Sequence, residues 1–150
     1  MKKNMLLIVA LLILMLTGFF IYKNNSGQAM LANQKESLEQ NKIETVILTF
    51  SQNMSRVKPP QLDQAAIQEN LSLLTMEAKE RVEAGPNLSS GLAMFAGVQD
   101  VPDEGVMVNT INIQNNTADA QVQWNYSGQD VIKYFTLFKI DGSWKIDQIR

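Results

Sequence analysis

The residue best suited to proton-transfer chemistry in this 150-residue chain is Asp147, in the segment WKIDQI. A carboxyl group among apolar side chains has a raised pKa and can act as a general base. The alternation of the segment favours another arrangement, in which Asp147 points outward from Ile146 and pairs with a neighbouring lysine. We expect this second arrangement, so the sequence predicts no catalytic residue.

Two residue types that carry much of protein chemistry are missing, because the chain has no histidine and no cysteine. Histidine is the usual general base near neutral pH, and cysteine supplies thiol nucleophiles, disulfides and thiolate ligands. Asp100, Asp103 and Glu104 form an acidic cluster that could bind a cation weakly, but the sequence lacks the calcium-loop spacing D-x-D-x-D-G. We expect solvated charges at this cluster, with no metal site and no cofactor.

Other side chains could bind a ligand or a nucleic acid. Trp124 and Trp144 could stack on a planar ligand, yet tryptophans on the inner face of a small sheet are more often core residues, which is what we expect. Once Lys2, Lys3 and Lys23 are set aside, the formal net charge of −2 becomes −5. The sequence has no basic stripe, so we expect no nucleic-acid partner.

A sheet must position most of these residues, because the hydrophobic period changes to two from Val106 onward. The clearest strand, ADAQVQWNY, alternates polar residues with Ala118, Ala120, Val122, Trp124 and Tyr126. VMVNTINIQ precedes it, and VIKYFTLFKI and SWKIDQI follow it. Asp141-Gly142 between the last two segments is a strong hairpin signal. The sequence therefore predicts an antiparallel meander of about four strands.

Helices are predicted before this sheet. Residues 29–57 lack proline and glycine, and the second half of this stretch has helical spacing at Ile43, Val46, Ile47, Phe50, Met54 and Val57. Pro59 and Pro60 end this helix, although a break near Asn41 is also open. Asp63 and Thr75 are placed to cap two shorter helices, QAAIQENLSLL and MEAKERVEA. Helices packed on an antiparallel sheet make an α+β fold.

Residues 85–105 form the least regular segment, because they hold four of the eight glycines and half of the prolines. Leu92, Phe95 and Val98 give this predicted loop an apolar centre. Such a loop can pack over the core or can contact another protein. We take these three residues as a candidate partner surface.

The N-terminal segment is long enough to span a membrane. Residues 4–22 are uncharged, and as a helix they would extend roughly 28 Å. Lys2 and Lys3 precede the segment and only Lys23 follows it, so we expect a cytoplasmic N-terminus and an exported remainder. Lipidation is excluded, because LTGFFIYK has Phe19 where a lipoprotein has cysteine. The alternative is a signal cleaved after Ala29, which would release a secreted protein.

The expected organisation is a transmembrane anchor over residues 1–23, a polar helical stalk over 24–40 and one α+β domain over 41–150. The final hairpin has Tyr134, Phe135, Leu137 and Phe138 before Asp141-Gly142, and Trp144, Ile146 and Ile149 after it. This pattern, after a helical first half, resembles the nuclear transport factor 2-like superfamily. The resemblance implies a curved sheet that wraps a long helix into a cone.

The resemblance also implies two kinds of function. Membrane-anchored members in bacterial envelopes are mostly adaptor or assembly domains, whereas the enzymatic members place an acid, a tyrosine or a histidine in the cone. The residues here that could line such a cavity are Tyr126, Tyr134, Trp124 and Asp147, although no catalytic position of the family maps onto them.

We expect a single-pass, non-enzymatic protein of a bacterial envelope, whose domain outside the cell membrane binds another envelope protein or a second copy of itself. The alternative is small apolar ligand binding, or isomerase-like proton transfer, in the cone. A cavity filled by Phe50, Met54 and Trp124 would count against this alternative.

Overall fold

The computed structural model describes residues 30–57, 62–98, 102 and 104–150. The chain divides into two compact units, Met1–Glu39 and Gln40–Arg150. In the described part of the first unit, residues 30–39 are helical and mostly exposed. Among all the described residues, no helix combines the length and the apolar character needed to cross a bilayer. The anchor predicted over residues 4–22 lies outside these residues.

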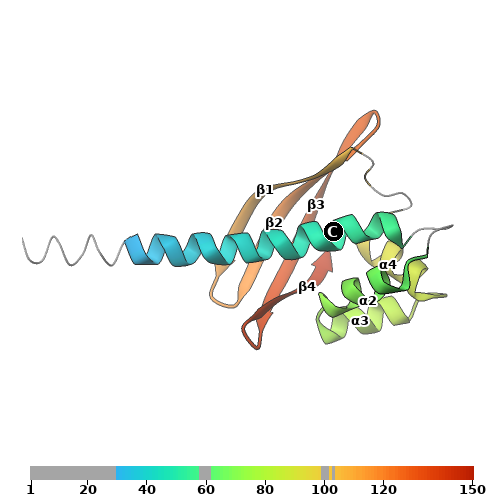
Figure 1. Cartoon of the computed structure of the whole chain (residues 1–150), viewed down its shortest axis with the longest axis horizontal. Coiled ribbons are helices and arrows are strands. Elements are labelled where there is room, and N and C mark those ends of the chain that lie inside the picture. Colours follow the sequence, from blue (N-terminus) through green and yellow to red (C-terminus); the bar gives the residue numbers. More distant parts are fainter. Residues whose placement is uncertain (1–29, 58–61, 99–101, 103) are drawn as a thin grey trace, which may run out of the picture. The chain divides into compact units, whose positions relative to one another are not determined.

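The helices of the second unit begin and end close to the predicted positions (Figure 1). The first of them is helical to residue 56, and its described residues include Asn41 without a break. It is followed by α2 (Gln64–Ser72) and α3 (Met76–Glu83). The predicted caps are confirmed, because the Asp63 side chain accepts hydrogen bonds from the Ala65 and Ala66 amides, and the Thr75 hydroxyl accepts one from the Ala78 amide.

The predicted sheet is also confirmed. Its strands are β1 (Gly105–Gln114), β2 (Thr117–Tyr126), β3 (Gln129–Ile140) and β4 (Ser143–Ile149). They form one antiparallel sheet in the order β1-β2-β3-β4. Asp141 and Gly142 both have positive φ, 50° and 79°, as a tight two-residue hairpin turn requires. The domain is therefore α+β.

The prediction of an irregular segment over residues 85–105 is wrong for its central part, which forms α4 (Leu88–Ala96). The Asn87 side chain caps its first turn, and Gly97 ends it at a φ of 62°. Gly91 lies within this helix, at the position where α4 comes closest to α3. A Cβ atom added at Gly91 would lie 1.9 Å from the Val82 carbonyl oxygen. Glycine is needed here so that two helices can approach each other.

The core of the domain lies between its helices and one face of the sheet. The first helix contributes Ile43, Ile47, Phe50 and Met54, all of which are almost completely buried. The Phe50 ring makes edge contacts with Phe95 of α4 and Phe135 of β3, at centroid distances of 6.3 and 6.4 Å. The space between this helix and the sheet is thus filled with side chains.

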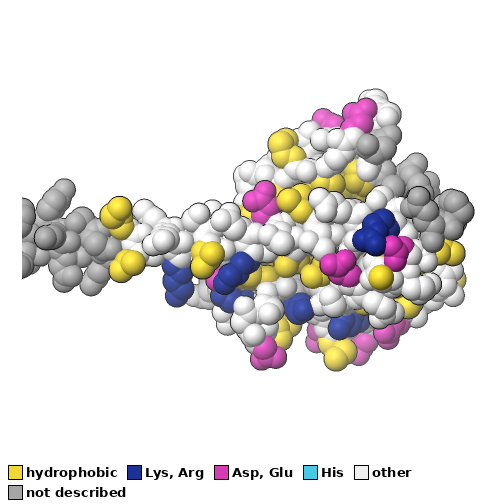
Figure 2. All heavy atoms as spheres, viewed as in Figure 1, with side chains coloured by type: hydrophobic (Ala, Val, Ile, Leu, Met, Phe, Trp, Pro, Cys, Tyr) yellow, Lys and Arg dark blue, Asp and Glu magenta, His cyan; other side chains and the backbone are white. Residues whose placement is uncertain are grey.

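Polar contacts fix α2 against the first helix. The Asn53 amide donates to a Glu69 carboxylate oxygen at 2.8 Å, and Arg56 pairs with Asp63. The buried Asn70 amide donates to the Phe50 carbonyl oxygen at 3.2 Å. On the face of the domain that Figure 2 presents, basic and acidic side chains are interspersed.

Candidate functional site

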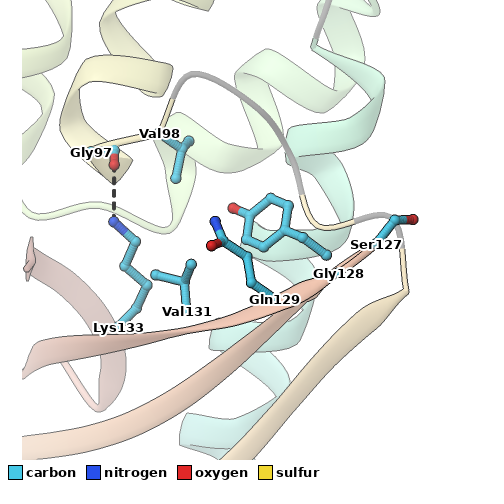
Figure 3. Close-up of a pocket in the computed structure, with 8 residues that line it drawn as sticks. Gly97, Val98, Ser127, Gly128, Gln129, Val131 and Lys133 are labelled. Carbon is cyan, nitrogen blue, oxygen red and sulfur yellow. Dashed lines mark hydrogen bonds between the residues drawn. The ribbon is translucent and has the colours of Figure 1, made fainter.

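A pocket of about 570 Å³ lies where the C-terminal end of α4 approaches the hairpin between β2 and β3 (Figure 3). Two lining residues come from the end of α4, namely its C-cap Gly97 and the next residue, Val98. The hairpin contributes the remaining lining residues, which are Tyr126, Ser127, Gly128, Gln129, Val131 and Lys133. The volume falls within the range of roughly 300–1,000 Å³ that small-molecule sites occupy.

The strand pairing places the hairpin residues on one face of the sheet. Tyr126 pairs with Gln129, Trp124 with Val131 and Val122 with Lys133. Because side chains alternate along a strand, residues 129, 131 and 133 share the face that carries the core. Gly128 makes the turn between the strands at a φ of 99°, a conformation that favours glycine.

Lys133 is the charged group of this pocket, and only 9% of it is exposed. Its ammonium donates a hydrogen bond to the Gly97 carbonyl oxygen at 2.9 Å, at the negative end of α4. None of the ion pairs found among the described residues involves Lys133. Burial lowers the pKa of this ammonium from its ordinary value.

Sequence reasoning missed Lys133, although the signal was present. The odd-numbered positions 131 to 137 of β3 are Val131, Lys133, Phe135 and Leu137, so a lysine interrupts an apolar face. A charged residue on the buried face of a strand needs a hydrogen-bonding partner. Its partner comes from α4, which the sequence did not predict as a helix.

The structure does not bring the four candidate cavity residues together. Trp124 is completely buried in the core, and its ring lies 6.4 Å from that of Phe135. Tyr126 lines the pocket, whereas Tyr134 is 51% exposed and lies on the opposite face of the sheet. Tyr126 pairs with Gln129 and shares its face of the sheet. Tyr134 lies five positions after Gln129, an odd number, so the alternation of side chains places it on the opposite face.

Asp147, the fourth candidate, lies at an irregularity of β4. Leu137 pairs with Ile146 and Thr136 with Gln148, so Asp147 is an extra residue in β4, as in a β-bulge. Its carboxylate accepts a hydrogen bond from the Thr75 hydroxyl at 2.8 Å and lies 3.7 Å from the Arg81 guanidinium. The partner is therefore an arginine of α3, where the sequence suggested a neighbouring lysine. This arrangement joins β4 to α3.

The remaining aromatic and loop candidates occupy different environments. Trp144 is buried, with the Lys139 ammonium 5.6 Å from its ring centre. Leu92 is completely buried, and Phe95 is partly buried beneath the Arg81 guanidinium. Val98 lines the pocket. Leu92, Phe95 and Val98 consequently do not form one exposed surface.

An exposed apolar surface is found instead on the face of the sheet that points away from the core. We call it the outer β3 row, and it consists of Ile132, Tyr134, Phe138 and Ile140. These side chains are each between 38 and 51% exposed. Their cross-strand neighbours on β2 include Gln123, opposite Ile132, and Gln121, opposite Tyr134.

No group of three or more carboxylates that could hold a metal ion occurs among the residues that the structure describes. Asp100 and Asp103 of the predicted acidic cluster lie outside those residues. Glu104 lies within them and precedes β1. The pocket and the outer β3 row are two candidate sites among the described residues.

Comparison with known proteins supports the fold. No curated protein sequence matches the chain. A chain of the type VI effector-immunity complex Tae3-Tai3 from Ralstonia pickettii has 20% identity and a TM-score of 0.52, over 71% of this chain and 91% of that one. An NTF-2 like protein of unknown function from Silicibacter pomeroyi DSS-3 has 17% identity and a TM-score of 0.48, over 77% of this chain and 98% of that one.

A family model also matches part of the chain. The family is described as putative lumazine-binding, and the match covers residues 93–148. This range includes all the described lining residues of the pocket. With the observed helices and antiparallel sheet, the match supports the resemblance to the nuclear transport factor 2-like superfamily at the level of fold.

Proposed function

We propose that this chain is a non-enzymatic binding protein, anchored in a bacterial cell membrane by residues 4–22, whose domain outside the membrane binds another envelope protein. The outer β3 row is the observation that carries this proposal. It places two aromatic and two aliphatic side chains on one face of β3, on either side of Thr136, and each of the four is at least 38% exposed. Aromatic side chains on an exposed face are typical of protein interfaces.

The shape of the row indicates the chemistry of the partner. The row is one side chain wide, and β2 flanks it with the amides of Gln121 and Gln123. A partner that presents a single row of apolar side chains on a strand or a helix, flanked by hydrogen-bonding groups, would complement it. A flat apolar surface would instead bury the Gln121 amide without a partner, at an energetic cost, whereas the Gln123 amide already donates to the Asn125 and Asp130 side chains.

The filled core supports a binding role over catalysis. Phe50, Met54 and Trp124 occupy the space in which a catalytic cavity of the cone would lie. The chain from Ralstonia pickettii, which shares the fold, belongs to an effector-immunity complex, so a domain of this fold can bind another protein.

A photo-crosslinking amino acid at position 134, in the full chain in its native membrane, tests the proposal. We expect a covalent adduct with one separate envelope protein, whose affinity can then be measured with both proteins purified. The double variant Tyr134→Ser/Phe138→Ser should weaken this binding at least about tenfold, because a few aromatic side chains commonly supply most of the binding free energy of an interface.

Met94→Ser is the matched control, because Met94 is 70% exposed but lies on α4, away from the row. It should leave the affinity unchanged. An adduct between two copies of the chain would identify self-association as the role of the row, in place of a separate partner. Equal losses for the row variant and the control would contradict any specific role of this face.

A second candidate function is the binding of a small molecule in the pocket between α4 and the β2–β3 hairpin. The name of the matching family, putative lumazine-binding, favours this candidate, because the match contains the pocket. Titration of the full chain with lumazine, followed by the change in thermal stability, tests it. An unchanged unfolding midpoint at saturating lumazine would contradict lumazine binding.

A further inference from the structure

We propose that the pocket binds a small organic acid, whose carboxylate pairs with Lys133 and whose apolar part lies between Val98 and Val131. This inference rests on the second candidate function and specifies the ligand class. It is independent of protein binding by the outer β3 row, because alternation along β3 places the two sites on opposite faces.

The first argument is the charge of the pocket. Lys133 is more than nine-tenths buried, and no described residue supplies a carboxylate to it. Its neighbours on the same face of β3, Val131 and Phe135, are apolar. A buried charge is costly unless an opposite charge accompanies it. A ligand carboxylate would supply that charge.

The second argument is the hydrogen-bonding capacity of the ammonium. A lysine ammonium has three N–H donors, and the Gly97 carbonyl oxygen accepts from one of them. The bond to Gly97 holds Nζ at the wall of the pocket (Figure 3). The other donors can serve the oxygens of a carboxylate. Gly97 itself permits this position, since a Cβ atom there would lie 3.3 Å from Nζ.

The third argument is the arrangement of the other walls. In Figure 3, Val98 of the α4 side and Val131 of β3 lie on opposite sides of the pocket. The side chain of Gln129 also lines the pocket, and in Figure 3 its amide lies apart from the Lys133 ammonium. The lining is mixed, because the side chains of Tyr126, Ser127, Gln129 and Lys133 share it with Val98 and Val131. The two valines beside the Lys133 ammonium suit a small molecule with one charged end and a small apolar body.

A purely structural role for Lys133 makes a different prediction. As a cap for the last carbonyl groups of α4, the ammonium would stabilise the domain without any dependence on ligand. The two roles can therefore be separated by probes that match in shape and differ in charge. Benzoate and benzamide are such a pair.

The experiment measures the thermal unfolding midpoint of the full chain in a non-ionic detergent, at constant ionic strength. About 10 mM benzoate should raise the midpoint by about 5 °C, and the same concentration of benzamide should raise it by less than about 1 °C. Lys133→Met should abolish the benzoate effect. Lys42→Met, which removes the same charge from an exposed position of the first helix, should retain it.

Three outcomes would overturn the inference. Equal shifts with benzoate and benzamide would show a pocket that does not select charge, and would leave the second candidate function standing. A benzoate shift that persists in Lys133→Met would place the anion elsewhere. No shift with benzoate, benzamide or lumazine would contradict both the inference and small-molecule binding, without bearing on the outer β3 row.

A second measurement avoids the case in which Lys133→Met does not fold. Reductive methylation of the wild-type chain, followed by peptide mass spectrometry, reports the accessibility of each lysine amine. Benzoate should slow the methylation of Lys133 at least about threefold relative to Lys42, because the bound anion pairs with the amine and favours its protonated form. Equal rates with and without benzoate would overturn the inference.

Discussion

The environments of Asp63 and Lys133 act in opposite ways on the charged forms of these two residues. The Asp63 carboxylate is solvated, and it accepts hydrogen bonds from the Ala66 amide and from Arg56, which lower its pKa. The Lys133 ammonium is buried, and burial lowers its pKa by disfavouring the charged form. The native state thus favours the charge of Asp63 and disfavours that of Lys133.

The lowered pKa of Asp63 predicts that the free energy of unfolding decreases as the pH falls into the acid range. The folded state binds this proton less tightly than the unfolded state does, so the carboxylate stabilises the fold above its ordinary pKa of 3.8. This contribution is lost as the pH falls through the lower pKa of the folded state. Asp63→Asn keeps a capping oxygen but removes the charge.

We therefore expect Asp63→Asn to lower the free energy of unfolding at about pH 7, with a smaller effect at about pH 3. Urea unfolding at both values measures this difference. Glu80→Gln, an exposed change on α3, is the control and should change the free energy of unfolding at about pH 7 by less than about 0.5 kcal/mol. An Asp63→Asn effect of equal size at both pH values would contradict the role assigned to the charge.

At the scale of elements, the close contact between α3 and α4 depends on glycine. A Cβ atom at Gly91 would lie 1.9 Å from the Val82 carbonyl oxygen, and one at Gly85 would lie 2.7 Å from the Gly91 Cα atom. Neither contact can be relieved by a side-chain rotation, because the obstructing atoms belong to the backbone. The two helices would have to separate.

Gly91→Ala should accordingly lower the free energy of unfolding by at least about 2 kcal/mol, despite the better helix propensity of alanine. Chemical denaturation of the full chain measures the loss. Met94→Ala, at an exposed position of the same helix, should change the free energy of unfolding by less than about 0.5 kcal/mol. A Gly91→Ala variant as stable as this control would show that α3 and α4 are not in such close contact.

The sequence predicted the elements that local signals determine. Asp63 and Thr75 marked two helix starts, because a cap acts within three residues, and Asp141-Gly142 marked a hairpin. The sequence did not predict α4, because sequence alone does not distinguish a glycine that breaks a helix from one that permits two helices to pack closely. The partner of Gly91 is known only once Val82 is placed beside it.

The candidate site was less predictable for the same reason. Its lining comes from α4 and from a hairpin about thirty residues further along the chain, and no short-range pattern joins them. Asp147 was also difficult to place, because a bulge in β4 changes the alternation that the prediction assumed. Tyr126 was a candidate from the sequence and does line the pocket.

At the scale of the whole molecule, the core is contained in one unit. The buried hydrophobic cluster runs from Ile43 to Ile149, which lies within the unit Gln40–Arg150. Residues 30–39 contribute none of its members, and Met30, Leu31 and Leu38 are exposed. The domain therefore has a core of its own.

The anchor predicts how the full chain should fractionate. If residues 4–22 span the cell membrane, the chain should remain in the membrane pellet after alkaline carbonate extraction, because the apolar helix is held by the bilayer. A variant without residues 1–29 should be recovered in the soluble fraction. The intact mass of the purified protein should include Met1, and a soluble chain that begins at Met30 would show cleavage after Ala29 instead.

The alternation of side chains along β3 restricts the insertions and deletions that this strand can accept during evolution. Lys133 lines the pocket, whereas the adjacent residues Ile132 and Tyr134 both lie on the outer face of the sheet. With the pairing kept at the Gly128 turn, loss of one residue between Gly128 and Lys133 would move the lysine into solvent and the tyrosine into the core. Homologues that keep both sites should therefore vary in length within their turns, and keep the length of this strand fixed.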